Sequence, residues 1–194
     1  MDYMFRALRA NEIDCRVAQI RENGLSLLLY KDARVDQNIL DETVGPMGWQ
    51  RTHSRDNANC IVSIWDSATS QWISKEDTGT ESNAEAAKGL ASDSFKRACF
   101  NWGIGRELYT APSIWISADN ANIKIYQNGR QTCSDHFSVE KILIDDNRNI
   151  VAISIKNDTL KRRVFVWDRR PKESKNGSNR ENIRSREGLE NREN

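Results

Sequence analysis

The sequence has few of the features that catalysis, secretion or membrane insertion require. No apolar run approaches the roughly 18–20 residues of a membrane span, and residues 1–10 contain no apolar segment of the kind found in a secretory signal. The G-x-x-x-x-G-K-[ST] loop that binds nucleotide phosphates and the G-x-S-x-G motif of hydrolases are both missing. We therefore expect a cytoplasmic protein that is not an enzyme, has no catalytic residues and binds neither a membrane nor a cofactor.

Metal-ligating residues are also few and scattered. The chain has four cysteines and two histidines, with no C-x-x-C pair among them. We expect four reduced thiols and no metal site. Asp145 and Asp146 are adjacent carboxylates, but the sequence D-D-N-R around them is typical of a turn, which accounts for the aspartates without metal chemistry.

Charge is balanced over the 194 residues, at a formal net value of +1, and 38% of the residues are hydrophobic. Residues 169–194 contain eight Lys or Arg and five Asp or Glu, which leaves 21 basic and 23 acidic residues in 1–168. A basic surface must therefore be local. The last 26 residues are rich in Asn, Arg, Glu and Ser, and we expect a disordered tail there.

Alternation and turn signals predict the first elements. Two apolar segments flank Asn23-Gly24 within residues 13–30, which predicts a β-hairpin. A helix is predicted over 32–44, with Asp32 as its N-cap and Gly45-Pro46 as its stop. Three strands are predicted to follow as an antiparallel meander, at 48–54, 59–65 and 71–75.

The longest helix is predicted over residues 82–102, where small and apolar side chains recur on one face. Ser82 and Glu85 form a capping-box pattern at its start, and Gly103-x-Gly105 ends it. Further strands are predicted in the last third of the chain, as a hairpin of 137–144 with 149–155 and a short strand at 164–167. The predicted class is α+β.

Lys96 and Arg97 form a basic pair on this helix, on the side away from its alanines. Lys88 lies two turns earlier, and Arg106 lies just beyond the helix end. Such a pair is most often a solvated surface. The alternative is phosphate binding, in which basic side chains position a nucleic-acid strand without reading its bases.

Three stretches in this region carry motifs. They are residues 30–49, ending in D-E-T-V-G-P-M-G-W; residues 76–82, E-D-T-G-T-E-S; and residues 91–105, which contain D-S-F-K-R-A followed by Gly103. In this order they resemble the Rad fifty-two / Rad twenty-two family of single-strand annealing proteins, in particular its short phage and prophage members. The resemblance covers about residues 25–112.

The resemblance implies a β-β-β-α core, in which a curved antiparallel sheet packs on the long helix, with an extra C-terminal hairpin and the disordered tail. It implies one annealing domain over 1–168, with its motifs in 25–112 and the hairpin region in 113–168, followed by the tail from 169 to 194. The family assembles into rings or helical multimers around a basic groove that holds single-stranded DNA.

Lys96 and Arg97 match the basic pair of that groove, and Arg34 lies within one residue of a groove arginine. The chain departs from the family where another arginine often follows this pair, because position 100 is Phe100. The segment before the long helix is also short and lacks a further lysine. The candidates to compensate, and to complete the predicted DNA-binding set, are Lys75, Lys88 and Arg106.

The function implied is ATP-independent binding of single-stranded DNA and annealing of complementary strands in homologous recombination and double-strand break repair, in a bacterial or phage-infected cell. The predicted partners are single-stranded DNA, further copies of the chain and, through the tail, a single-strand-binding protein. One alternative is a module that binds double-stranded or structured RNA without annealing. Another is a metal-dependent nuclease, against which the missing carboxylate cluster argues.

Six tryptophans remain to be assigned. Tryptophans can stack on bases, but they are more often buried in cores or interfaces, and we expect that for these six. They are Trp49, Trp65, Trp72, Trp102, Trp115 and Trp167.

Overall fold

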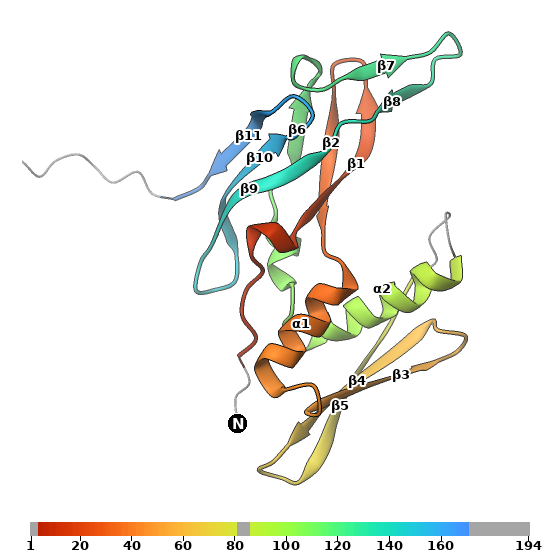
Figure 1. Ribbon diagram of the computed structural model, residues 1–194, viewed down its shortest axis with the longest axis vertical. Coiled ribbons are helices and arrows are strands. Elements are labelled where there is room, and N and C mark those ends of the chain that lie inside the picture. The colour runs from red at the N-terminus through yellow and green to blue at the C-terminus, as the bar shows by residue number, and fades with distance from the viewer. Residues whose placement is uncertain (1–3, 81–85, 171–194) are drawn as a thin grey trace, which may run out of the picture.

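The computed structural model describes residues 4–80 and 86–170, with side chains of the helix that follows the gap described from residue 89. Two sheets lie at opposite ends of the molecule, and the two helices lie between them (Figure 1). The expected start of the long helix at Ser82 and Glu85 lies outside the described residues. Of the expected tail, 169–194, the part from residue 171 onward also lies outside them. Arg169 and Arg170 are described, and the backbone N–H of Arg169 donates to Val151, so β pairing continues into the expected tail.

The larger sheet has six antiparallel strands and contains the predicted hairpin around Asn23-Gly24. The sheet has two halves, which are joined where Asp14 pairs with Ser138 on the neighbouring strand. Its edge strands approach each other, so the sheet is nearly closed. In spatial order the strands are β11 (Arg162–Asp168), β10 (Ile150–Asn157), β9 (Phe137–Ile144), β1 (Asp14–Arg21), β2 (Gly24–Tyr30) and β6 (Ile114–Ser117).

No strand is predicted between residues 113 and 136, and the structure has three there. β6 completes the larger sheet, while β7 (Ile123–Ile125) and β8 (Gln131–Cys133) form a separate two-stranded ribbon. These strands have three or four residues. They are too short for alternation to show in the sequence, since a period-2 pattern needs several residues. The predicted C-terminal hairpin, β9 with β10, therefore belongs to a sheet that also contains the N-terminal hairpin.

The smaller sheet is the predicted meander, in the order β3 (Trp49–Ser54), β4 (Asn59–Asp66) and β5 (Gln71–Thr78). Strand β5 runs three residues beyond its predicted end and places Asp77 opposite Cys60. The helix α2 (Ala86–Asn101) packs on β4 and β5, its side chains Phe95 and Ala98 are fully buried, and the ring of Phe95 stacks on Trp49 of β3. The elements β3, β4, β5 and α2 follow one another along the chain, and the expected β-β-β-α core of the family stays a prediction.

The helix α1 (Ala33–Val44) begins and ends as the sequence predicts. The carboxylate of Asp32 accepts a hydrogen bond from the backbone N–H of Arg34, which caps the helix. At its end Gly45 turns the chain, and a side chain at Gly48 would overlap the carbonyl of Val44. The indole of Trp49 donates to Asp41 at 2.7 Å and fixes the start of β3 against α1.

Three short 3₁₀ helices complete the description: η1 (Ala10–Glu12), η2 (Arg106–Thr110) and η3 (Ala118–Asn120). No helix within the described ranges is long and apolar enough to cross a membrane.

All four cysteines are free, as expected, and burial raises the pKa of Cys60 to about 11. Asp145 has the predicted turn role, because its carboxylate accepts from the backbone N–H of Asn149 at 2.8 Å.

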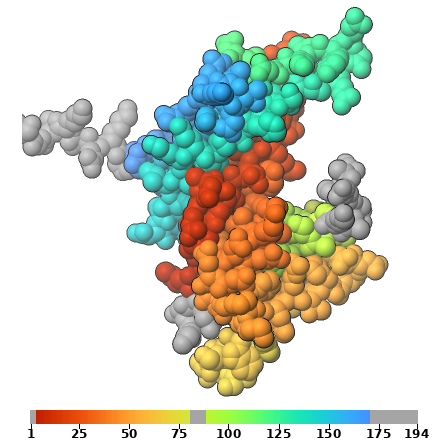
Figure 2. All heavy atoms as spheres, in the orientation of Figure 1, coloured from red at the N-terminus to blue at the C-terminus, as the bar shows by residue number. Residues whose placement is uncertain are grey.

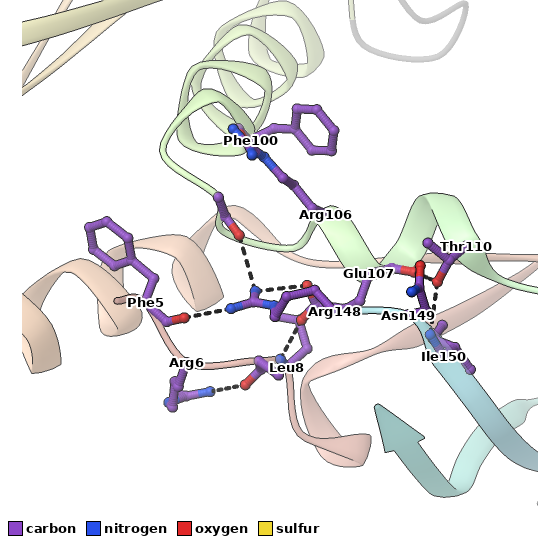
Figure 3. A network of polar contacts seen from close by, with 12 residues as sticks. Phe5, Arg6, Leu8, Phe100, Arg106, Glu107, Thr110, Arg148, Asn149 and Ile150 are labelled. Atoms are coloured by element: carbon purple, nitrogen blue, oxygen red, sulfur yellow. Dashed lines mark hydrogen bonds and ion pairs between the residues drawn. The ribbon is translucent and has the colours of Figure 1, made fainter. Parts of the chain in front are cut away.

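A buried carboxylate, Glu107 in η2, links segments that are far apart in the sequence (Figure 3). One of its oxygens accepts from the backbone N–H of Leu8 at 2.6 Å, and the other accepts from Arg148 at 2.9 Å. Arg148, in the β9–β10 turn, also donates to the carbonyls of Phe5 and Gly103. The N-terminal segment runs over the joint between the larger sheet and α1 (Figure 2). The network therefore connects that segment, the larger sheet and Gly103, two residues beyond the end of α2.

Replacing Arg148 with Ala should lower the free energy of unfolding by about 3 kcal/mol, because Glu107 would remain buried without its cation. Urea unfolding monitored by circular dichroism measures this change. The matched control is Arg163→Ala, which removes an exposed ion pair with Glu140 and should have a much smaller effect. Equal losses in the two variants would contradict the structural role of the Glu107–Arg148 pair.

Candidate nucleic-acid interface

The predicted basic pair lies on the side of α2 opposite its buried side chains, and from there Arg97 contacts Asp77 at the edge of the smaller sheet. Asp93, Lys96, Arg97 and Phe100 are spaced three and four residues apart, which places them on one side of a helix. Phe95, Ala98 and Cys99 point the other way and are fully buried. The helix periodicity therefore determines that Lys96 and Arg97 lie together near solvent.

This face of α2 borders a cavity of about 240 Å³. The last residues of β2 and the 3₁₀ helix η2 complete its walls. Its charged lining residues are Lys31, Asp93, Lys96 and Arg97, and the others are Tyr30, Phe100, Tyr109, Leu29, Leu108 and Gly105. The cavity thus combines two accessible cations with three aromatic rings.

A buried ion pair lies beside the cavity. Lys31 donates to both carboxylate oxygens of Asp36, and their side chains are 7% and 0% exposed. Burial raises the pKa of Asp36 to about 6, against the opposing effect of the Lys31 charge. Gly105 lies directly against the Lys31 side chain, in a left-handed conformation with φ of 77°. Because Lys31 is already paired, its charge is largely neutralised by Asp36.

Lys96 is half-buried and forms no ion pair with any residue in 4–80 or 89–170. The hydrogen bond from Arg34 is the main cause of the lowered pKa of Asp32, and the charge of Lys96 adds to it. Lys96 also lowers the pKa of Asp36, against the larger effect of burial. The ammonium group of Lys96 is therefore electrostatically close to the start of α1 and available to an anion.

Arg97 is exposed and has a loose contact with β5. Its Nε lies 3.4 Å from a carboxylate oxygen of Asp77, and the Asn101 amide donates to the other oxygen at 3.2 Å. The Arg97 side chain is 44% exposed, so a phosphate can approach it without breaking a buried interaction. This geometry brings Arg97 and Lys96 to the same rim of the cavity.

The other predicted DNA-binding residues are placed differently. Arg34 is 83% exposed and pairs with Asp32 at 2.8 Å, outside the lining of the cavity. Lys75 and Arg106 both donate to the carbonyl of Asn101, at 2.9 and 3.0 Å. They therefore stabilise the C-terminal end of α2, where cations are favourable. Lys88 belongs to α2, but its side chain is not described.

Both of those cations also lie over aromatic rings. The ammonium of Lys75 is 4.4 Å from the ring centre of Trp102, and the guanidinium of Arg106 is 5.4 Å from that of Phe100. The indole of Trp102 donates to the carbonyl of Val62 at 3.0 Å, in agreement with its expected packing role. Trp65 and Trp72 pack edge to face, and both are more than a third exposed, as is Trp115, so these three lie outside the core of the chain and an interface role for them stays a prediction.

Sequence reasoning missed the aromatic wall of the cavity. From the sequence Phe100 is only a departure from the arginine of the family motif, and no binding role is predicted for Tyr30 or Tyr109. Phe100 and Tyr109 pack with ring centres 4.7 Å apart. The helical spacing could have placed Phe100 in the site, because it follows Lys96 by about one helical turn. Nothing in the sequence places Tyr109 beside Phe100. No cluster of potential metal ligands occurs among the described residues.

Two curated bacterial proteins are similar to part of this chain. Both are named single-stranded DNA-binding protein DdrA, one from Deinococcus radiodurans and one from Deinococcus deserti, and they are 34% and 32% identical over 97 residues. The matched segment is 49% of this chain and 46% and 48% of the relatives, so the match spans about half of each relative's length. No family model and no solved structure matches the chain. The names of both relatives describe binding of single-stranded DNA and no catalytic activity.

Replacing Gly105 with Ala should destabilise the protein more than replacing Gly129 with Ala. Both glycines have φ of 77°, so each variant incurs about 1 kcal/mol of backbone strain. Only at Gly105 would the added methyl group overlap Lys31, which the Asp36 pair prevents from moving aside. Urea unfolding of the two variants measures the difference, and equal losses would contradict a fixed position of Lys31 beside the cavity.

Proposed function

We propose that this chain binds single-stranded DNA across the rim of the cavity and anneals complementary strands without ATP, in DNA repair by recombination. The observation that carries the proposal is the pairing of Lys96 and Arg97, two accessible cations on one rim of a cavity lined by aromatic rings. The two relatives named as single-stranded DNA-binding proteins support the DNA-binding part of it. The annealing part is supported by the resemblance to the annealing family.

The distribution of charge is compatible with this function. Residues 1–168 have a slight excess of acidic groups, so attraction of DNA must come from a local group of cations. Lys96 and Arg97 provide such a group, and Arg34 extends it along the start of α1. Each contact with a phosphate releases counterions from the strand, which gives binding its characteristic dependence on salt.

Annealing needs no nucleotide hydrolysis, because base pairing supplies the free energy. The protein has to neutralise the phosphates of one strand and leave its bases accessible to the second strand. Basic groups at a rim, with space beside them, satisfy both requirements. We further propose that the tail contributes to DNA affinity or to contact with a single-strand-binding protein, in the cytoplasm of a bacterial or phage-infected cell.

We also propose that copies of the chain assemble into a ring or helical filament, which would repeat the basic rim along a DNA strand. The strand order of the smaller sheet leaves one edge of β3 and one edge of β5 unpaired within the described chain, and open edges are common sites of association. Light scattering at micromolar concentration should show multimers. A monomer with and without DNA would contradict this assembly.

The double variant Lys96→Ala with Arg97→Ala should weaken binding to single-stranded DNA and reduce the slope of log affinity against log salt by about 1.4, which corresponds to two lost phosphate contacts. Fluorescence anisotropy with a labelled oligonucleotide, titrated with salt, measures both quantities. ATP-free annealing of complementary oligonucleotides should slow in the same samples.

The control for net charge is Lys124→Ala with Arg130→Ala, two exposed cations of the β7–β8 ribbon. This control should retain the wild-type slope and annealing rate. Unchanged annealing in the Lys96/Arg97 variant would refute the proposed site. Displacement of the DNA by duplex RNA at equal concentration would favour the RNA-binding alternative.

A further inference from the structure

We propose that Tyr109 is a stacking platform for one nucleobase, held at the mouth of the cavity while the adjacent phosphates contact Lys96 and Arg97. This inference rests on the proposed function and specifies how the strand lies on the site. It assigns to η2 a binding role that neither the basic motif nor the DNA-binding relatives indicate.

Tyr109 is both exposed and fixed. Its side chain is 73% exposed, which is unusual for an aromatic ring that has a defined neighbour. Phe100 packs against it at 4.7 Å with an interplanar angle of 56°, and Arg106 in turn lies over Phe100. The ring is therefore held in position while much of its surface remains open. A platform that is already in place costs little conformational entropy when a ligand stacks on it.

The buried network strengthens this arrangement. Glu107 lies two residues before Tyr109 in η2 and is anchored by Leu8 and Arg148. The hydroxyl of Thr110, the next residue after Tyr109, accepts from the backbone N–H of Ile150 at 2.8 Å and donates to the carbonyl of Glu107. The backbone on both sides of Tyr109 is thus tied to the larger sheet.

The charges around the cavity favour a base inside and phosphates at the rim. Lys31 is neutralised by Asp36, so the buried side offers no free cation to a phosphate. Asp93 contributes a carboxylate to the lining, and its charge would repel a phosphate. The accessible cations, Lys96 and Arg97, stand beside the aromatic rings. Phosphates are therefore attracted to the rim, and the uncharged base is directed toward Tyr109, Phe100 and Tyr30.

The size of the cavity fits this ligand. At about 240 Å³ it is smaller than the roughly 300–1,000 Å³ of pockets that hold drug-sized molecules. A single base can enter such a space, whereas a folded nucleic-acid element cannot. Stacking uses the face of the base and not its edge, so it tolerates every base and leaves the pairing edge free. A base on Tyr109 therefore stays compatible with annealing.

The test separates base stacking from phosphate binding by using two probes with the same backbone. One is a labelled oligothymidylate of about 20 nucleotides, which exceeds the usual length of a single-strand site. The other is a strand of equal length built from abasic nucleotides. Anisotropy titrations with the full chain compare the wild type, Tyr109→Ala, Tyr109→Phe and a control, Tyr126→Ala. Tyr126 is 52% exposed and lies at the β7–β8 turn, away from the cavity.

Tyr109→Ala should bind oligothymidylate about five- to tenfold more weakly than the wild type, and the abasic strand equally well. The salt dependence should not change, because the phosphate contacts remain. Tyr109→Phe and Tyr126→Ala should behave as the wild type. Circular dichroism verifies that each variant is folded, which is expected for a side chain this exposed.

Wild-type affinity of Tyr109→Ala for oligothymidylate would overturn the inference and leave the proposed function standing. An equal loss on the abasic strand would also overturn it, because the residue would then act through the phosphates or the fold. If the wild type itself did not bind oligothymidylate, the proposed function would fail together with the inference.

Discussion

The ion pair between the buried Glu107 and the partly exposed Arg148 fixes the relative positions of parts of the molecule that are far apart in the sequence. Glu107 has no contact with solvent, so its charge is tolerable only with a cation and hydrogen-bond donors in place. Arg148 and the backbone of Leu8 meet that requirement from the β9–β10 turn and the N-terminal segment. Arg148 also binds the carbonyl of Gly103. The chain between α2 and β6 is thereby held to the larger sheet.

The candidate site depends on this constraint, since two of its walls are the face of α2 and η2. A second buried pair, Lys31 with Asp36, supports the site from the side of β2 and α1. Because the charges of Lys31 and Asp36 cancel, Lys96 and Arg97 are the accessible cations among the described residues that line the cavity. The charge of the site is therefore decided as much by which cation is already paired as by how many cations are nearby.

Three residues predicted to bind DNA, Arg97, Lys75 and Arg106, have the same charge but different positions and hydrogen-bond partners. Arg97 lies at the rim with a loose carboxylate contact, whereas Lys75 and Arg106 are bound to the carbonyl of Asn101 at the end of α2. In the sequence Arg97 lies on the predicted helix, Arg106 follows that helix and Lys75 ends a predicted strand, and each is simply a basic residue. Hydrogen bonding to a helix end involves strands and turns that come together only in the folded chain, so local pattern could not separate the three roles.

Much of the local structure could be predicted because its causes are local. Asn23-Gly24 specifies a turn, Asp32 caps its own helix, and the spacing of Lys96 and Arg97 on α2 follows from 3.6 residues per turn. The short strands β6, β7 and β8 were not predicted, since three or four residues give no clear alternation. The partner of β6, strand β2, is also distant in the sequence, whereas β7 and β8 pair with each other across a short turn.

The sequence by itself determined that the chain has a mixed set of helices and strands, that its thiols are free and that two adjacent cations share one helix face. Only the tertiary structure decided that this face borders a cavity, that Asp36 neutralises Lys31 there, and that Tyr109 packs beside Phe100. The physical reason is that capping, turns and helix periodicity act over a few residues. A binding site requires side chains from β2, α2 and η2 to converge, and burial and long-range ion pairs bring them together.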